Sequence, residues 1–159
     1  MFTMSFFTGR RKGEILALSA SDIRKDSILF NKTYTRKTVD GSAYKITTSK
    51  NEKIGYTPIC PALRSALADY HGESPFFFGG QEPISEKVLS RAFDKYIAAA
   101  DVKRIRYHDL RHSFVSMLLH NGANFMVVAD LIGDTVEQVI KTYGHLYESD
   151  KIRIVETII

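Results

Sequence analysis

Two glycines divide the last third of the chain into helix-length segments, and this division constrains the fold more than any other feature. The segments cover about residues 108–120, 124–132 and 135–142. Gly122 and Gly133 stand between them, where the end of a helix favours a residue that tolerates positive φ. The sequence therefore predicts three consecutive short helices in a mostly helical domain.

The earlier part of the chain mixes helical and extended patterns. Helices are predicted over about residues 10–18, from Pro61 to about Tyr70, and from the capping residue Ser85 to about Ala100. Short runs rich in β-branched and aromatic residues predict three strands, at residues 27–34, 43–48 and 56–59. The expected connections are turns at Asp40-Gly41 and residues 49–53, and a buried or short extended stretch from Phe76 to Gly80. The expected fold class is α+β, a helical domain with a small three-stranded antiparallel sheet inserted after the first helix.

Length and composition agree with one folded domain spanning residues 1–159. A chain of 159 residues, 44% of them hydrophobic, can bury one core. No run of about 18 apolar residues is present, which excludes a membrane-spanning helix. Cys60 is the single cysteine, which excludes an internal disulfide and fits a reducing, cytoplasmic compartment. Because Met1 leads directly into an apolar stretch without a helix cap, we expect the chain to be the C-terminal piece of something longer.

Positive charge is concentrated in the predicted sheet. Residues 24–53 contain eight basic and three acidic side chains, a net charge of +5, whereas the whole chain carries +4 and the remainder therefore −1. Such a patch is typical of a protein that binds a phosphate backbone. A solvated, lysine-rich sheet edge that resists aggregation is the alternative explanation. The side chains expected to contact DNA are Lys32, Arg36, Lys37, Lys45 and Lys53.

The predicted helix over residues 108–120 separates polar from apolar side chains. His108, Arg111 and His112 fall on one face, because residues three and four apart are neighbours. An arginine there can hold two phosphate oxygens and stays charged at any relevant pH; a solvated helix start with Arg111 paired to Asp109 or a neighbour is the alternative. The residues expected to face the core are Leu110, Phe114, Met117 and Leu118.

A metal site has to be weighed on the same helix. His108 and His112 have the spacing of two zinc ligands, with Asp109 in place of a glutamate base. Arg111 would place a cation beside the metal, and the other histidines offer no third ligand at a known spacing. We therefore expect no metal and no cofactor, and a zinc hydrolase is the third functional hypothesis.

Tyr143 is the candidate nucleophile. A phenol has a pKa of about 10 and reacts slowly unless cations stabilise its anion. Its activation would need Arg11, Arg111 and a lysine to meet at its hydroxyl. The alternative is an aromatic ring packed at the end of a helix.

Four motifs in order resemble the signatures of the tyrosine recombinases, the phage-integrase family. They are Thr8-Gly9-Arg10-Arg11-Lys12-Gly13-Glu14, the stretch from Ser49 to Ile59 with Lys50, His108-Asp109-Leu110-Arg111-His112, and Ile132-Gly133-Asp134 nine residues before Tyr143. The resemblance runs from Phe6 to about Tyr147. It implies the family's catalytic domain, with catalytic places for Arg11, Lys50, His108, Arg111 and Tyr143 and the variable place for Arg10.

The resemblance also implies a reaction. Arg11 and Arg111 would bind the scissile phosphate while Tyr143 attacks phosphorus, forming a 3′-phosphotyrosine and releasing a 5′-hydroxyl. Lys50 would protonate that leaving oxygen, and His108 would assist proton transfer or orient the phosphate. The implied function is site-specific recombination or integration of double-stranded DNA by a tetramer on DNA. The segment from Ser149 to Ile159 would dock on a neighbouring protomer, or else cover its own domain.

Two features depart from the family pattern. Asp134 stands where the family usually has His, less often Trp, as a donor to a phosphate oxygen, and an ionised aspartate cannot donate. Loss of one such donor costs about 10²–10³ in rate. The sequence thus predicts a slow enzyme, an Asp134 that points away, or a protonated Asp134. A DNA-binding relative that no longer cleaves is the alternative function, and the family's N-terminal DNA-clamping domain has no counterpart in residues 1–159.

Overall fold

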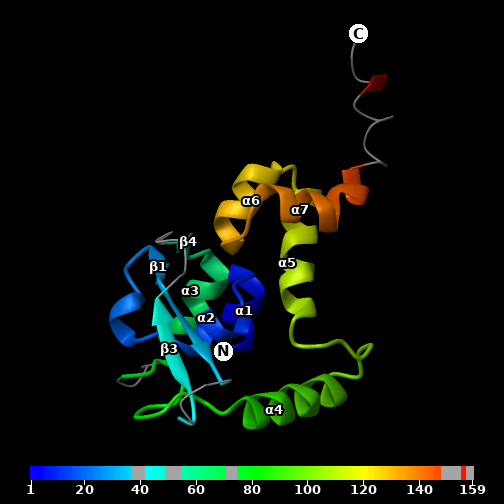
Figure 1. Cartoon of the computed structure of the whole chain (residues 1–159). Coiled ribbons are helices and arrows are strands. Elements are labelled where there is room, and N and C mark those ends of the chain that lie inside the picture. The colour runs from blue at the N-terminus through cyan, green and yellow to red at the C-terminus, as the bar shows by residue number, and fades with distance from the viewer. Residues whose placement is uncertain (37–41, 49–54, 71–74, 148–154, 157–159) are drawn as a thin grey trace.

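Figure 1 shows the computed structural model of the chain, which describes residues 1–36, 42–48, 55–70, 75–147 and 155–156. The helices are α1 (Phe2–Thr8), α2 (Lys12–Leu16), α3 (Pro61–Ala68), α4 (Glu86–Ala99), α5 (Asp109–His120), α6 (Phe125–Ile132) and α7 (Val136–Tyr143). The strands are β1 (Ser27–Phe30), β2 (Lys32–Thr35), β3 (Lys45–Thr48) and β4 (Gly55–Pro58), and the 3₁₀ turns are η1 (Ala20–Asp22) and η2 (Gly144–Tyr147). The mostly helical α+β architecture is the one that the sequence predicts.

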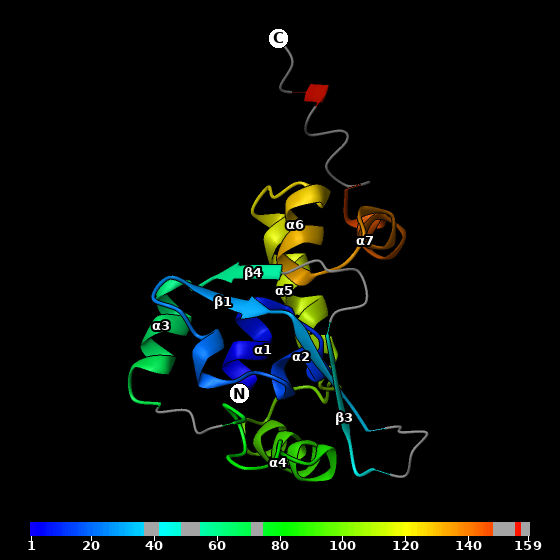
Figure 2. The same ribbon diagram turned by 60° about the vertical axis from the view of Figure 1, so that its left-hand side comes forward.

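The described strands form two antiparallel pairs instead of one three-stranded sheet. β1 pairs with β4, and β2 pairs with β3; Figure 2 shows β1 and β4 lying side by side. The predicted strand over residues 27–34 is divided at Asn31, where the chain leaves one partner strand and joins another. Its β-branched and aromatic residues continue through this change, so the pattern predicts extended backbone but not two partners. The expected three-stranded sheet is therefore wrong in its pairing, while its place after the first helices is right.

The N-terminal segment forms a helix that the sequence analysis did not predict. α1 ends at Gly9, whose φ of +59° is in the left-handed region and whose N–H donates to the Ser5 carbonyl. A Cβ on Gly9 would also lie 2.5 Å from the Phe114 ring. The predicted helix over residues 10–18 is consequently shorter, because the backbone is extended at Arg11 and α2 begins after it.

Buried side chains of the described residues form two apolar clusters. One lies among α1–α3 and the strands: Met4, Ile15, Leu18, Ile28, Phe30, Leu63, Phe77 and Phe78. The other lies among the last three helices: Phe114, Val115, Leu119, Val128, Ala129, Ile132, Val139 and Tyr143. α1 packs on α5, and β4 packs on α6, so the two clusters are joined through these contacts. The predicted buried stretch from Phe76 to Phe78 is confirmed.

The helices of the second half agree with the prediction. α4 starts at Ser85, whose hydroxyl accepts from the Val88 N–H, and α5, α6 and α7 fall within the predicted ranges to within a residue or so. Gly122 and Gly133 have φ values of +84° and +66°, as expected for helix ends. The core face of α5 is shifted slightly, because Val115 and Leu119 are buried with Phe114 while Met117 and Leu118 are partly exposed. None of the helices in the described ranges is both long enough and apolar enough to cross a bilayer.

Candidate active site

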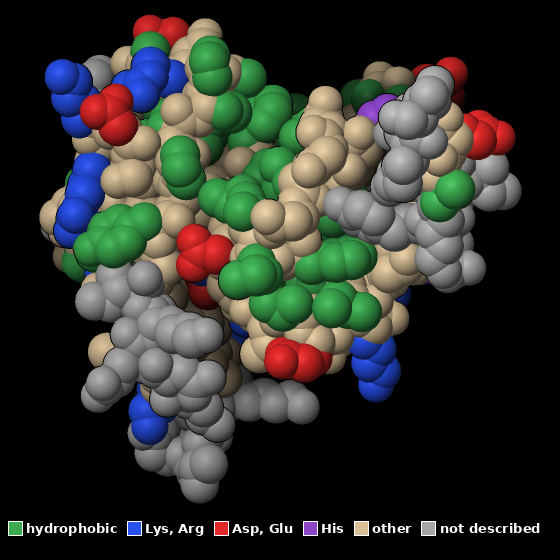
Figure 3. All heavy atoms as spheres, turned by 90° about the horizontal axis from the view of Figure 1, so that it is seen from above, with side chains coloured by type: hydrophobic (Ala, Val, Ile, Leu, Met, Phe, Trp, Pro, Cys, Tyr) green, Lys and Arg blue, Asp and Glu red, His purple; other side chains and the backbone are tan. Residues whose placement is uncertain are grey.

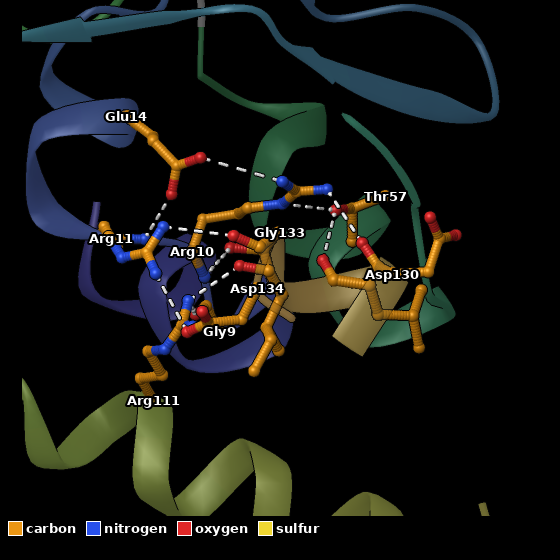
Figure 4. Close-up of polar contacts among 12 residues, drawn as sticks. Gly9, Arg10, Arg11, Glu14, Thr57, Arg111, Asp130, Gly133 and Asp134 are labelled. Atoms are coloured by element: carbon orange, nitrogen blue, oxygen red, sulfur yellow. Dashed lines mark hydrogen bonds and ion pairs between the residues drawn. The ribbon is translucent and has the colours of Figure 1, made fainter. Parts of the chain in front are cut away.

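Arg111 joins three parts of the fold at the centre of the candidate site (Figure 4). Its Nη1 donates to the carbonyls of Gly9 (2.8 Å) and Ile132 (2.7 Å), which lie at the C-terminal ends of α1 and α6. Helix ends of this kind carry negative partial charge that stabilises a cation. Its Nη2 donates to Asp134 Oδ2 at 2.5 Å, and only 6% of the side chain is exposed. Burial lowers the pKa of Arg111, as does the neighbouring charge of Arg11, while Asp134 acts in the opposite direction.

Arg11 donates to the same carboxylate oxygen. It lies in extended backbone before α2, where its own N–H donates to Glu14 Oε2 (2.7 Å). Its guanidinium donates to the Gly133 carbonyl (3.0 Å) and to Asp134 Oδ2 (2.8 Å), and half of the side chain is exposed. Two guanidinium groups that are far apart in the sequence therefore meet at one oxygen atom, and one of them is accessible to a ligand.

Asp134 points into the arginine pair and not away from it. Oδ2 accepts from both guanidinium groups, and Oδ1 accepts from the N–H of Thr135 at 3.1 Å. The carboxylate is an acceptor in each of these contacts, as the sequence analysis expects of an ionised aspartate. Its position after Gly133 is set by the left-handed turn that ends α6. In this structure an anionic group of the protein itself occupies the space between the two arginines.

Arg10 has a structural role that the sequence analysis did not find. Its guanidinium is buried, donates to Thr57 Oγ1 (3.1 Å) on β4 and to the Asp130 carbonyl (3.4 Å) on α6, and lies over the Phe30 ring. Glu14 Oε1 is 3.7 Å away, and burial lowers the pKa of Arg10. The motif separates the two adjacent arginines by giving Arg11 the catalytic place, but nothing in the sequence indicates that Arg10 is buried between β4 and α6.

Gly133 is required both for its backbone and for the room it leaves. Its φ is +66°, and a Cβ there would lie 2.2 Å from Arg10 Nη1. We expect Gly133→Ala to lower the free energy of unfolding by about 3 kcal/mol, from left-handed strain and overpacking together. Gly122→Ala is the matched control, because its φ is +84° but no atom lies within 4 Å of the added Cβ. Urea unfolding of both variants is the measurement, and equal losses would contradict the role assigned to Arg10.

Tyr143 ends α7 with its ring in the apolar cluster of the last three helices. It is 7% exposed, and its hydroxyl lies 2.6 Å from Nδ1 of His112 on α5. Burial raises the pKa of Tyr143, the Arg111 charge lowers it, and the Asp134 charge raises it further. The Tyr143 ring is therefore packed at the end of a helix, as the alternative predicts, but its hydroxyl also contacts a specific polar partner, His112.

His108 precedes α5 by one residue and is exposed. Its ring meets that of His112 edge-on, with centroids 5.1 Å apart, as expected for one helix face. Partial burial lowers the pKa of His108, and the charges of His112 and Arg111 act in the same direction. Asp109 pairs with Arg106 (2.9 Å), whereas Arg111 pairs with Asp134, so the pairing of Arg111 with Asp109 that the sequence left open is wrong.

The remaining predicted site residues include three that the structure does not describe and three that it places on or beside the β2–β3 pair. Lys50, Lys37 and Lys53 lie outside the described residues. Lys32 donates to the buried Asp22 carboxylate at 2.8 Å, which neutralises its charge. Arg36 and Lys45 are exposed near one end of the β2–β3 pair, where Thr35 lies opposite Lys45. Within the described ranges, no three His, Cys, Asp or Glu side chains are placed to share a metal ion.

Comparison with known proteins identifies the family. Residues 1–150 match the sequence model of the phage integrase family. The chain belongs to the phage integrase family. As a phage integrase relative it is 29% identical over 163 residues to the ICEBs1 integrase of Bacillus subtilis (strain 168), covering 92% of this chain and 44% of that protein. It is 30% identical over 157 residues to a tyrosine recombinase of Pseudothermotoga lettingae, covering 95% of this chain and 50% of that protein.

Solved structures of integrases share the fold of this family member. The Tn1549 transposon integrase in complex with a circular intermediate DNA superposes with a TM-score of 0.73 at 18% identity, over 88% of this chain and 52% of that one. The catalytic domain of bacteriophage HP1 integrase gives 0.63 at 22% identity, over 99% and 79% of the two chains. The chain spans about half the length of the curated relatives it matches.

Proposed function

We propose that this chain is the catalytic domain of a site-specific DNA recombinase that cleaves and rejoins double-stranded DNA through a covalent 3′-phosphotyrosine. The observation that carries the proposal is the meeting of two guanidinium groups at one anionic oxygen near a buried tyrosine. Burial raises the pKa of that tyrosine, and the Arg111 charge acts in the opposite direction. Relatives named as an integrase and a tyrosine recombinase support it. Because these relatives are about twice as long, we propose that residues 1–159 are one domain of a longer cytoplasmic protein.

The scissile phosphate would take the position that the Asp134 carboxylate holds between Arg11 and Arg111. Planar guanidinium groups bind phosphate oxygens in pairs. Donors already placed where charge develops stabilise the transition state without reorganisation. The half-exposed Arg11 offers the route of entry, whereas the buried Arg111 is held by two backbone carbonyls. DNA binding therefore has to displace an anion of the protein itself.

The family resemblance assigns each step of the chemistry to a residue. The Tyr143 oxygen attacks phosphorus, the bond to the 5′-oxygen breaks, and a 3′-phosphotyrosine forms. Lys50 would protonate the leaving oxygen, and the exposed His108 would assist proton transfer or orient the phosphate. Rejoining reverses these steps with the 5′-hydroxyl of another strand. The phosphotyrosine bond keeps the energy of the broken bond, so the reaction needs no ATP, and none of these steps uses a metal or a cofactor.

A nicked DNA duplex carrying the recombination site of the protein tests the proposal. Loss of the short 5′-hydroxyl fragment beyond the nick would prevent rejoining and trap the covalent protein–DNA adduct, which denaturing gel electrophoresis detects. A cleavage-deficient DNA-binding protein, the second candidate, would bind the duplex and leave no adduct. The carboxylate between the arginines is the observation that favours this second candidate.

Replacement of Asp134 separates these two functions further. We expect Asp134→His to form the adduct at least tenfold faster, because the substitution removes an anion from the phosphate position and supplies a donor. The same change should lower the free energy of unfolding by about 1–3 kcal/mol, since two guanidinium groups lose their shared acceptor. Single-turnover adduct formation and urea unfolding measure the two effects. A variant that is no faster than the parent would show that Asp134 does not limit the reaction.

The exposed basic side chains of the β2–β3 pair are proposed to contact the DNA backbone. We expect Arg36→Ala with Lys45→Ala to weaken binding to all duplex sequences alike and to reduce the slope of log affinity against log salt by about 1.8, or about 0.9 for each phosphate contact. Lys141→Ala is the control, because Lys141 is an exposed lysine on α7, outside the β2–β3 pair. Salt titration of DNA binding is the measurement, and an unchanged slope in the double variant would exclude this surface.

An exposed apolar surface on α6 and α7 is proposed to mediate self-association on DNA. Figure 3 shows the face that α6 and α7 present, where apolar side chains gather and Lys and Arg side chains lie toward the edges. Met126, Val127 and Ile140 on these helices are each about half exposed or more. Such a face suits contact with protein better than contact with phosphate. Light scattering of the DNA complex tests the expected tetramer, and a protein that stays monomeric on DNA would contradict it.

A further inference from the structure

The Tyr143 hydroxyl has a partner to which the proposed reaction has so far assigned no role. Its oxygen lies 2.6 Å from Nδ1 of His112, with the two ring centroids 5.6 Å apart. A neutral imidazole whose proton is on Nε2 accepts at Nδ1, and the phenol then donates. This distance is within the range at which a general base can take a proton in a single step.

A buried phenol needs such a partner. Tyr143 is largely enclosed by the apolar cluster, and burial raises its pKa more than the nearby Arg111 charge lowers it. The hydroxyl is therefore protonated near neutral pH and a weak nucleophile. The arginines can stabilise negative charge on the phosphate, but as permanent cations they cannot remove a proton.

Two adjacent residues of α5, Arg111 and His112, contact different parts of the site. Arg111 points to the ends of α1 and α6 and to Asp134. His112, the next residue along the helix, points instead to α7 and Tyr143. His108 lies one turn earlier, with its ring against that of His112. The side chain of His108 is exposed, whereas that of His112 is partly buried. One helix thus carries a phosphate ligand and a separate group that contacts the nucleophile.

We propose that His112 is the general base of the cleavage step, resting on the recombinase function proposed above. Its Nδ1 takes the proton of the Tyr143 hydroxyl as the tyrosine oxygen bonds to phosphorus. The bond from phosphorus to the 5′-oxygen breaks, and that oxygen receives its proton from Lys50. In the rejoining step the 5′-hydroxyl gives its proton back to Lys50 as it attacks phosphorus, and His112 returns its proton to the departing tyrosine oxygen.

Two substitutions distinguish a base from a residue that only holds the tyrosine in place. Asn has an amide oxygen at about the position of Nδ1, so His112→Asn can keep the hydrogen bond but cannot take up a proton. We expect His112→Asn and His112→Ala to slow single-turnover adduct formation by about 10²–10⁴-fold, the usual contribution of general-base catalysis. His120→Ala is the control, because His120 is exposed at the far end of the same helix.

A DNA substrate with sulfur in place of the bridging 5′-oxygen shows whether His112 acts on the attacking tyrosine or on the 5′ leaving group. A thiol ionises at a pKa of about 8.5, so this leaving group departs without the acid that an alcohol requires. The sulfur substrate should restore cleavage by Lys50→Ala but not by His112→Asn. Restoration of His112→Asn would place His112 on the leaving-group side and overturn the proposal.

The outcomes also separate this proposal from the function on which it rests. If the unaltered protein forms no adduct on the nicked duplex, the proposed recombinase function itself is wrong. If the unaltered protein forms the adduct and His112→Asn forms it at the same rate, the recombinase function stands and His112 has only a positioning role. Urea unfolding and DNA binding of the Asn variant, both expected to match the parent, exclude loss of fold as the cause of a slower rate.

Discussion

Arg111→Lys is expected to slow covalent adduct formation by about 10²–10³-fold, the effect of losing one preorganised donor to the developing charge. Lysine keeps the positive charge but has one ammonium group, which cannot reach two backbone carbonyls and a phosphate oxygen together. In the structure those contacts are made by two separate nitrogens, Nη1 to Gly9 and Ile132 and Nη2 to Asp134. Single-turnover cleavage of the nicked duplex measures the change.

Substitution of Arg111 should also lower the free energy of unfolding. Arg111→Ala leaves the Asp134 carboxylate and two helix-end carbonyls without their buried donor, and we expect the free energy of unfolding to fall by about 3–5 kcal/mol. Arg104→Ala is the control, because Arg104 is 85% exposed and its pairing with Asp94 at 3.7 Å is an exposed ion pair, worth about 0–1 kcal/mol. A fully stable Arg111→Ala protein would show that the three elements do not depend on this side chain.

Tyr143→Phe is expected to abolish the adduct completely. Phenylalanine keeps the ring in the apolar cluster of α5, α6 and α7, and the lost hydrogen bond to His112 should cost only about 1 kcal/mol of stability. DNA binding should therefore remain close to that of the parent protein. Denaturing gels detect the adduct and fluorescence anisotropy the binding.

The next tyrosine in the sequence provides the control for this assignment. Tyr147→Phe should form the adduct at the parental rate. An adduct that survives in Tyr143→Phe and disappears in Tyr147→Phe would move the nucleophile to η2, beyond the end of α7. It would also remove the reason for assigning His112 a catalytic role.

The helices of this protein were predictable because their signals are local. The cap at Ser85 and the glycines at 122 and 133 act within one helical turn, and the structure has helix ends at these positions. α1 was missed because it begins directly after Met1 without a side-chain cap, so its apolar sequence carries no local signal for a helix start. The division of residues 27–34 at Asn31 was missed for a different reason, since both halves have extended patterns and only their distant partners differ.

The sequence by itself determined the order and spacing of the motifs, and with them the family and the positions of Arg11, Arg111 and Tyr143. Only the tertiary structure decided that Arg10 is buried, and that the Asp134 carboxylate lies between two guanidinium groups. It also decided that the tyrosine hydroxyl meets His112. Helix capping and periodicity depend on neighbours within a few residues, whereas these contacts depend on how separate elements pack, which no local pattern encodes.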